Sequence, residues 1–202
     1  IFYPQDKSLE EKYQNIWPNH IPNFKEDYVN LGLTLGKIQS SMLNHIDYYL
    51  KTKHNLNNDI FSKIIKLHDL FGQLICYKPP KKIINEWIAL HRDNGILTAL
   101  VHPNYYNVEE NKKIDGIACS LQIKDRLGNF HMASYNDNEL VLQIGEMMML
   151  FSAGYISATP HRVIVSEENK NYLRVNYAQV FDPTFSQMIY LPNNTTIDDI
   201  IN

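Results

Sequence analysis

Two short segments of the chain carry imidazole and carboxylate side chains in a pattern that can bind a metal ion. The first segment contains His91 and Asp93, and the second contains His161. Two neutral imidazole nitrogens and one carboxylate oxygen can occupy one face of a divalent iron and leave the opposite coordination positions open. Open positions on iron allow reactions with dioxygen, so these three residues are the candidate metal ligands.

The spacing of His91 and Asp93 places both side chains on one face of an extended segment, because side chains two positions apart on a strand point the same way. The surrounding residues are largely apolar, so a buried carboxylate here would need a partner. Taken alone, the simpler explanation of this triplet is a hydrogen-bonded His–Asp pair at a strand end. Likewise His161, which follows Pro160, fits a core or turn histidine. Only a fold that returns the chain across itself could join the two segments.

Arg174 and Asn176 share a face of a later strand in the same way. A guanidinium can hold a carboxylate through two parallel hydrogen bonds, and the carboxylate of a 2-oxo acid would suit it. A structural salt bridge is the alternative for an isolated arginine.

The elements that must position these residues begin with a helix. Apolar residues recur at three- and four-residue steps from Asp27 to Leu50, which predicts an amphipathic helix. Its stripe consists of Tyr28, Leu31, Leu35, Ile38, Met42, Ile46 and Tyr49. Gly32 and Gly36 each weaken a helix by about 1 kcal/mol relative to alanine, which predicts close packing there. A shorter helix is expected after a cap at 57–59, carrying Ile60, Ile64 and Leu67 inward.

From residue 71 the pattern changes to short strands. They are expected at 74–77, 83–101, 117–123, 130–134, 140–144, 162–165, 172–180 and 188–191, with a turn at Gly128 and Asn129. The polar stretch from His102 to Lys113 is expected to form a loop. Seven or eight short strands separated by turns predict a mainly β fold with flanking helices, as in a jelly roll or a sandwich.

Composition limits the classes of function. The 202 residues are 44% hydrophobic and carry a net charge of −3, which predicts one core-forming domain. No basic stripe predicts nucleic-acid binding, and no apolar run is long enough to span a membrane. The start lacks a signal-peptide pattern. Cys76 and Cys119 form no C-x-x-C motif and favour buried, inert thiols in a reducing, intracellular and cytoplasmic setting. The oligomeric state is left open.

Several ordered blocks resemble one enzyme family. Residues 87–98 (WIALHRDNGILT) resemble the His-x-Asp-x-Gly-Leu-Leu-Thr segment of the iron and 2-oxoglutarate-dependent dioxygenases, in the branch that includes isopenicillin N synthase. Residues 143–148 (QIGEMM) and 157–163 (SATPHRV) are similar to that branch's Ile-Gly-Asp-Met and Ser-Thr-Pro-His-Arg-Val segments. Residues 121–125 and 181–185 follow in family order, and the resemblance covers Trp17 to Pro192.

The resemblance implies a double-stranded β-helix, which is a jelly-roll core with flanking helices. A helical layer would span 1–70, the oxygenase core 71–192 and a tail 193–202. The resemblance implies that His91, Asp93 and His161 are the iron ligands and catalytic residues. Arg174, Tyr77 and Asn176, which stands where the family has serine, would hold the distal carboxylate of 2-oxoglutarate. The implied cofactors are Fe(II), 2-oxoglutarate as cosubstrate and O2, with ascorbate as an optional reductant.

The reaction implied is oxidation, usually hydroxylation, of a small organic substrate coupled to decarboxylation of 2-oxoglutarate. Phe181, Tyr106 and Met149 are candidate substrate contacts, although core packing would explain each equally well. Two alternatives stay open: an oxidase like isopenicillin N synthase that does not use 2-oxoglutarate, and a non-catalytic jelly-roll metal-binding protein. The chain departs from the family in the long polar loop 102–115, which would form a lid or an insertion. The branch's usual N-terminal strand is also missing ahead of Ile1.

Overall fold

A computed structural model describes residues 15–56, 59–64, 68–82 and 84–183 of the chain. The helices are α2 (Phe24–His54), α3 (Ile60–Ile64) and α4 (Glu146–Phe151). The strands are β1 (His68–Tyr77), β2 (Glu86–His91), β3 (Leu97–Val101), β4 (Asn104–Asn107), β5 (Lys112–Ile114), β6 (Leu121–Lys124), β7 (Phe130–Met132), β8 (Leu140–Ile144), β9 (His161–Ile164) and β10 (Leu173–Pro183). No helix in these described ranges is both long and apolar enough to cross a membrane.

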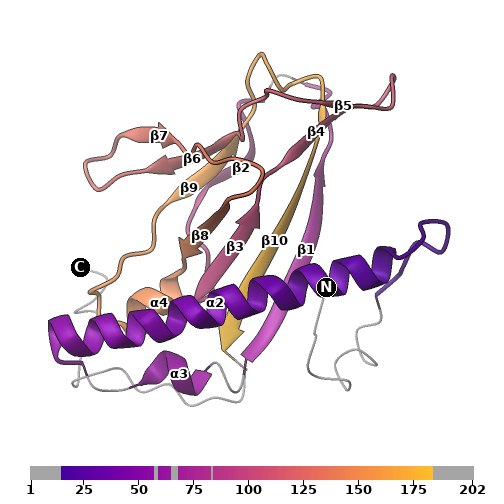
Figure 1. Cartoon of the computed structure of the whole chain (residues 1–202). Helices are drawn as coiled ribbons and strands as arrows, with labels where there is room; N and C mark the ends of the chain where they lie inside the picture. Colours follow the sequence, from indigo (N-terminus) through magenta and orange to yellow (C-terminus); the bar gives the residue numbers. More distant parts are fainter. Residues whose placement is uncertain (1–14, 57–58, 65–67, 83, 184–202) are drawn as a thin grey trace.

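The strands form two antiparallel sheets (Figure 1). The major sheet has the order β5-β4-β10-β3-β8, and β1 pairs with β10 from Arg174 to Pro183. The minor sheet has the order β2-β9-β6-β7. The mainly β jelly-roll core expected from the sequence is confirmed. The expected strand 188–191 and tail 193–202 lie outside the described residues.

The two faces of the major sheet have different surroundings. On β10, Gln179 donates a hydrogen bond to the carbonyl of Gly32 in α2 (2.9 Å), and Phe181 lies in the core cluster that α2 and α3 cover. Alternation along the strand therefore turns Arg174 and Asn176 to the opposite face. On that face Leu100 of β3 and Ala178 of β10 pack with Leu121 of β6. This opposite face thus looks toward the minor sheet, and the space between the two sheets is the barrel interior.

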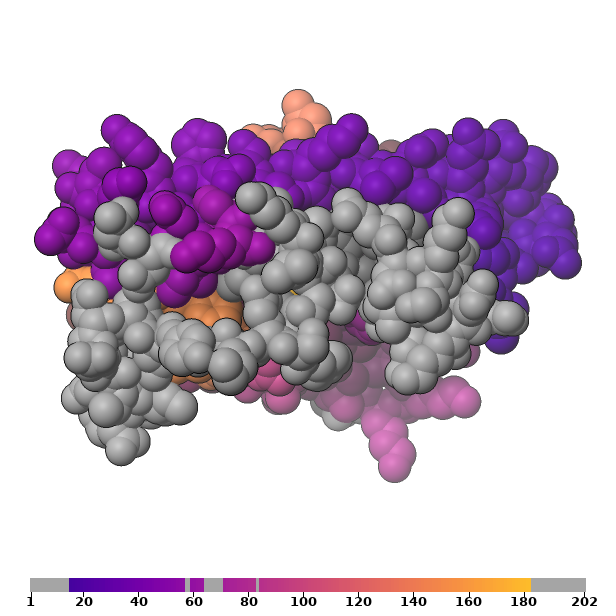
Figure 2. Space-filling view, turned by 90° about the horizontal axis from the view of Figure 1, so that it is seen from below, coloured from indigo at the N-terminus to yellow at the C-terminus, as the bar shows by residue number. Residues whose placement is uncertain are grey.

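Helix α2 crosses the outer face of the major sheet, and from below it runs along the molecule with α3 beside it (Figures 1 and 2). Its buried residues are Gly32, Leu35, Gly36, Gln39, Leu43, Ile46, Asp47 and Leu50. The predicted packing at Gly32 and Gly36 is confirmed, but the predicted stripe is rotated from the true one. Leu31, Ile38, Met42 and Tyr49 are at least 36% exposed.

Polar residues on the buried face of α2 explain the difference. Gln39 donates to the carbonyls of Leu97 (2.9 Å) and Gln179 (3.0 Å), and so joins α2 to two strands. The carboxylate of Asp47 accepts hydrogen bonds from the backbone of Phe61 and Ser62 at the start of α3. A stripe chosen by hydropathy alone omits such residues because their burial depends on partners that are distant in sequence.

The loop expected from His102 to Lys113 is wrong, because β4 and β5 form a hairpin there. Strand β4 pairs with β10 and extends the major sheet. The turn is closed by Asn107, whose side chain accepts from the backbone of Glu109 and Glu110, and by Asn111 at φ 49°. Most of the hairpin is exposed while Tyr105 is buried, which explains why the segment has no strand-like apolar alternation.

Candidate metal centre

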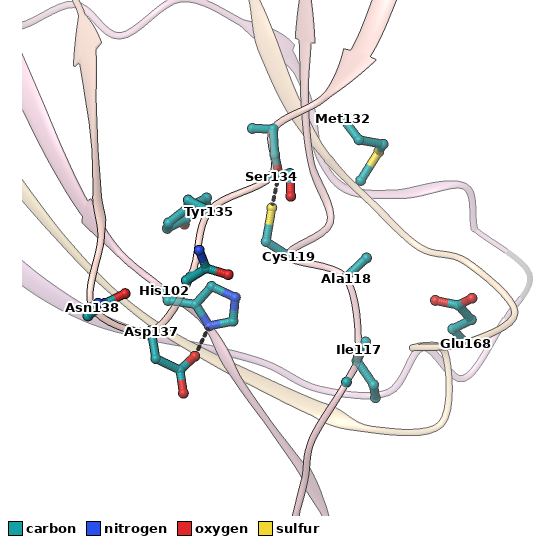
Figure 3. Close-up of a pocket in the computed structure, with 13 residues that line it drawn as sticks. His102, Ile117, Ala118, Cys119, Met132, Ser134, Tyr135, Asp137, Asn138 and Glu168 are labelled. Carbon is teal, nitrogen blue, oxygen red and sulfur yellow. Dashed lines mark hydrogen bonds and ion pairs between the residues drawn. The ribbon is translucent and has the colours of Figure 1, made fainter.

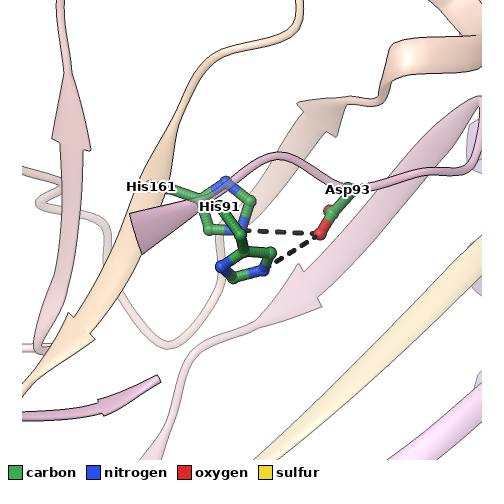
Figure 4. A group of neighbouring side chains, drawn as sticks. All are labelled: His91, Asp93 and His161. Atoms are coloured by element: carbon green, nitrogen blue, oxygen red, sulfur yellow. Dashed lines mark ion pairs between the residues drawn. The ribbon is translucent and has the colours of Figure 1, made fainter. Parts of the chain in front are cut away.

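The first part of the site is a cross-strand histidine pair. His91 ends β2 and His161 begins β9, and the two residues lie opposite each other in the antiparallel pairing. Their ring centroids are 4.3 Å apart. Asp93 follows just after β2, and its Oδ1 lies 3.5 Å from the Nε2 atom of each histidine (Figure 4). One potential ligand atom from each residue falls within 4.8 Å of the others.

Both imidazoles are held in the tautomer that a metal requires. His91 Nδ1 lies 2.8 Å from the carbonyl of Ala89, and His161 Nδ1 lies 3.1 Å from the carbonyl of Thr159. A carbonyl oxygen only accepts, so each Nδ1 carries the proton and donates it. Each Nε2 therefore keeps a lone pair directed toward the shared space. Such outer bonds are usual for metal-binding histidines.

The charges at the site also fit a divalent cation. Burial lowers the pKa of His161 below its ordinary value, against the raising effects of the Thr159 carbonyl and the Asp93 carboxylate, so the ring stays neutral. The Oδ2 atom of Asp93 is buried and has no hydrogen-bond partner among the described residues. A buried carboxylate oxygen of this kind requires a partner, and a metal ion would provide one. Two imidazoles and one carboxylate are the donor set of a facial iron site.

A close contact between two backbone segments fixes the position of Asp93. The carbonyl of Asp93 accepts from the backbone N–H of Glu146 at the start of α4 (2.7 Å), and Gly145 donates to the carbonyl of Ile96 (3.1 Å). A Cβ atom at Gly145 would lie 2.0 Å from the carbonyl oxygen of Gly95. Glycine is therefore required at this position so that α4 can support the turn that carries the carboxylate.

Arg174 and Asn176 form the second part of the site. Arg174 is 1% exposed, and its Nη2 donates to the carbonyl of Cys119 (3.3 Å). Its Nε and Nη1 atoms, and Oδ1 of the buried Asn176, have no partner among the described residues. The Tyr77 ring centroid lies 5.0 Å from the guanidinium carbon, and Tyr77 is opposite Arg174 in the β1–β10 pairing. An unpaired buried guanidinium fits an anionic ligand.

Both parts of the site face the barrel interior. On the minor sheet, His161 lies opposite Ile123 of β6, and Ile123 is two residues from Leu121, so the two share a face. Leu121 packs against Leu100 and Ala178 of the major sheet. Ala178 in turn is on the same face of β10 as Arg174. The metal triad and Arg174 therefore lie on the sides of the two sheets that face each other.

The candidate substrate residues are not brought together in this way. Phe181 is fully buried among the residues under α2 and α3, on the face of β10 away from Arg174. Tyr106 points away from its neighbour Tyr105, which lies opposite Arg174. Met149 is half-buried on α4. Core packing therefore accounts for Phe181, and neither Phe181 nor Tyr106 faces the barrel interior.

A separate cleft of about 690 Å³ lies in another part of the molecule from the three candidate metal ligands (Figure 3). Its lining includes Cys119, Tyr135 and an ion pair between His102 Nδ1 and Asp137 Oδ1 at 2.9 Å. Cys119 is buried as expected, whereas Cys76 is exposed on β1, contrary to expectation. The cleft contains none of the three metal-site residues.

Comparisons with known proteins show the fold. No protein-family model matches the sequence, and no curated protein matches it either. A 2OG-Fe(II) oxygenase family protein from Caulobacter crescentus is 21% identical with a TM-score of 0.70, covering 100% of this chain and 59% of that one. A full-length Neurospora crassa protein in complex with alpha-KG is 18% identical (TM-score 0.67), covering 92% and 55%. JOX2 in complex with 2OG, Fe and JA is 20% identical (TM-score 0.70), covering 91% and 49%.

The chain therefore has the fold of these oxygenases and spans about half to three fifths of their length. The sequence singled out the three candidate ligands that the structure brings together, and it also singled out the buried Arg174. Sequence reasoning missed Tyr105, Ser120 and the close contact at Gly145. Gly145 belongs to the segment 143–148 that resembles the family, so its importance could have been recognised from the sequence. Nothing in the local sequence indicates a role for Ser120.

Proposed function

We propose that this chain is the double-stranded β-helix core of a non-haem Fe(II) oxygenase that uses 2-oxoglutarate to oxidise a small organic molecule. The observation that carries the proposal is the set of side chains on the facing sides of the two sheets. Two Nε2 atoms and a carboxylate converge on one point, and a buried guanidinium has two nitrogens without a partner among the described residues. Fe(II) bound there would activate O2, with oxidative decarboxylation of 2-oxoglutarate to succinate and carbon dioxide.

The triad residues have separate roles in holding the metal. His91 and His161 present Nε2 atoms whose direction is fixed by their Nδ1 bonds to backbone carbonyls. Asp93 contributes the negative charge that offsets part of the charge on the cation, and its position depends on the contact with α4. Three protein ligands leave the remaining positions for reactants.

The second group of residues would bind the distal carboxylate of 2-oxoglutarate. Nε and Nη1 of Arg174 lie on opposite edges of the guanidinium and have no partner among the described residues, so one of them, together with the second N–H of Nη2, would hold a carboxylate that compensates the buried charge. The Tyr77 ring lies against the guanidinium, and its hydroxyl would add a donor to the same carboxylate. The side-chain oxygen and nitrogen of Asn176 can exchange places by rotation, so its amide can donate to the same carboxylate. Asn176 thus substitutes for the serine usual in the resembling family.

The buried Arg174 favours a function in which a carboxylate-bearing ligand is bound, because its Nε and Nη1 have no partner among the described residues. A purely structural metal site would not need such a cation. The solved complexes of the Neurospora crassa protein with alpha-KG and of JOX2 with 2OG, Fe and JA support the same function. The helical layer expected for residues 1–70 would end before His68, because β1 already belongs to the core that was expected at 71–192. The free thiols support a reducing cytoplasmic location.

The test is an anaerobic titration of the protein with Fe(II) and 2-oxoglutarate, followed by succinate measurement after O2 is added. We expect the weak visible charge-transfer band of a metal-chelated 2-oxo acid and succinate formation with ascorbate present. His91→Ala and Asp93→Ala should abolish both signals. His131→Ala is the matched control, because it removes a histidine from an exposed His–Asp pair on the β6–β7 hairpin.

Each alternative has its own outcome. Full succinate production by the Asp93→Ala variant would refute the ligand assignment. O2 consumption in the absence of any 2-oxo acid would indicate the oxidase. Iron binding with neither the band nor O2 consumption would indicate a non-catalytic metal-binding protein.

A further inference from the structure

The β4–β5 hairpin places one tyrosine directly beside Arg174. Tyr105 lies opposite Arg174 in the β4–β10 pairing and is 2% exposed. It is the buried member of a hairpin that is otherwise half-buried or exposed. A buried tyrosine hydroxyl needs hydrogen-bond partners. Its partners identify the segment of the chain that the hairpin holds in place.

The Tyr105 hydroxyl belongs to a buried chain of hydrogen bonds. It donates to the carbonyl of Ala118 (2.9 Å) and contacts the hydroxyl of Ser120. The amide of Asn169 donates to Ser120 Oγ (2.8 Å). Ser120 Oγ also lies 3.4 Å from the Ala118 carbonyl, so the two hydroxyl groups share this acceptor, and either of them can donate to the other. Burial raises the pKa of Tyr105, against the lowering effects of Ser120 and Arg174, so the hydroxyl keeps the proton that this chain needs.

This chain of bonds holds Ser120 in an unusual backbone conformation. Ser120 has φ 65°, in the left-handed region that is costly for residues other than glycine. Its side chain is 1% exposed and is held by Tyr105 and Asn169. The surrounding bonds therefore stabilise a conformation that the residue would not adopt by itself.

The result is a segment whose consecutive carbonyls are bound by different elements. The carbonyl of Ala118 accepts from the Tyr105 hydroxyl, and the carbonyl of Cys119 accepts from Nη2 of Arg174. The carbonyls of Ser120 and Leu121 accept from the backbone N–H groups of Ile164 and Ala133. The turn at Ser120 directs the Cys119 carbonyl at the guanidinium. A guanidinium is a rigid plane with five donors, so one fixed acceptor together with the Tyr77 ring determines where its other N–H groups point.

We propose that Tyr105, acting through Ser120, is a positioning residue for Arg174: it holds the Cys119 carbonyl on Nη2 and so orients the rest of the guanidinium toward the carboxylate of the cosubstrate. This inference rests on the proposed function, since it assigns a role in binding 2-oxoglutarate. The hairpin that carries Tyr105 is then part of the binding site. Its contribution is to orient Arg174 through the neighbouring strand β4.

The test compares two 2-oxo acids in anaerobic Fe(II) titrations that follow the visible band. 2-Oxoglutarate carries the distal carboxylate, whereas 2-oxopentanoate has the same chain length without it. In Tyr105→Phe the Kd for 2-oxoglutarate should rise about tenfold, as for other outer residues that orient a binding group. The Kd for 2-oxopentanoate, which is weak in the wild type, should not change. In turnover assays KM for 2-oxoglutarate should rise while kcat is kept.

Two further variants separate positioning from folding. Ser120→Gly removes the hydroxyl but suits the left-handed backbone, so it should fold and show the same selective rise. Tyr28→Phe is the control: it removes a tyrosine hydroxyl that bonds a backbone carbonyl (2.8 Å to Gly72) on the opposite face of the major sheet. It should leave both Kd values unchanged.

The outcomes distinguish this inference from the proposed function. A wild-type protein that binds no 2-oxoglutarate overturns both. Wild-type binding with an unchanged Kd in Tyr105→Phe and Ser120→Gly overturns the positioning role alone. Equal weakening of the two 2-oxo acids in these variants also overturns it, because general loosening of the site would not depend on the distal carboxylate. If Tyr105→Phe fails to fold, Ser120→Gly decides.

Discussion

At the scale of single residues, the buried polar atoms without a partner mark the binding site. Within the described ranges these atoms are Asp93 Oδ2, Thr98 Oγ1, Asn176 Oδ1, and Nε and Nη1 of Arg174. Thr98 lies opposite Val180 on β10, which puts it on the same face as Arg174 and Asn176. Folded proteins pair almost all their buried polar groups. The proposed metal ion and 2-oxo acid would provide partners for Asp93, Arg174 and Asn176.

The role of Asp93 can be tested by protein stability. In wild-type protein, Fe(II) at about one hundred times its Kd should raise the free energy of unfolding by about 2.7 kcal/mol, because a ligand that binds only the folded state stabilises it. In Asp93→Asn this gain should be largely lost, since the neutral amide cannot offset the charge on the cation. Anaerobic thermal unfolding with and without Fe(II) measures it. Asp125→Asn, in an exposed pair with His131, should keep the full gain; a full gain in Asp93→Asn would remove that residue from the ligand set.

Arg174→Leu should affect binding far more than folding. Loss of two hydrogen bonds between charged groups, at about 1.5 kcal/mol or more each, predicts at least a hundredfold rise in the Kd for 2-oxoglutarate. The stability of the ligand-free protein should stay equal or increase, because an apolar side chain replaces a buried unpaired charge. Urea unfolding and the anaerobic titration measure the two quantities. An unchanged dependence on 2-oxoglutarate would place its carboxylate elsewhere.

At the scale of elements, the site depends on where strands end and helices begin. The turn after β2 carries Asp93, and it is held by the N-terminus of α4 through backbone bonds. In Gly145→Ala the new methyl group would collide with the Gly95 carbonyl, so the turn or the helix must shift. We expect a loss of about 1–3 kcal/mol in stability, typical of overpacking, together with weakened iron binding.

Gly116→Ala is the contrast for this variant. Gly116 has φ 78°, and nothing lies within 4 Å of an added Cβ. Its cost should come from backbone strain alone, about 1–2 kcal/mol, with iron affinity unchanged. Urea denaturation and iron titration of both variants measure the difference. If Gly145→Ala binds iron as wild type does, the contact with α4 does not determine the position of Asp93.

The elements also show what the sequence could and could not predict. Strand parity placed Arg174 with Asn176, because the period of a strand is independent of its neighbours. It also predicted His91 beside Asp93, but Asp93 lies in the turn after β2 and reaches His91 through the contact with α4. The buried face of α2 could not be read from hydropathy, since Gln39 is buried through bonds to β3 and β10. The β4–β5 hairpin was hidden for a similar reason. The pairing of β4 with β10 is a tertiary contact, which the local sequence does not show. Tyr105 is the buried residue of the hairpin, so no apolar alternation marks the strands.

At the scale of the whole molecule, the proposed ligands connect the two sheets. His91 and His161 belong to β2 and β9 of the minor sheet, whereas Arg174 belongs to β10 of the major sheet. Iron alone would engage only the minor sheet and the turn that carries Asp93. A 2-oxo acid with a distal carboxylate would contact the metal at one end and Arg174 at the other. Its binding should therefore stabilise the packing of the sheets against each other, in addition to each sheet by itself.

This bridging predicts that iron and 2-oxoglutarate stabilise the protein cooperatively. The gain in unfolding free energy with both present should exceed the sum of the separate gains by about 1–3 kcal/mol, the usual range of coupling between sites. Hydrogen exchange should show protection of β2 and β9 with iron alone, extending to β10 when 2-oxoglutarate is added. 2-Oxopentanoate lacks the distal carboxylate and should leave β10 unprotected. Purely additive gains, or equal protection of β10 by both 2-oxo acids, would show that the cosubstrate does not join the sheets through Arg174.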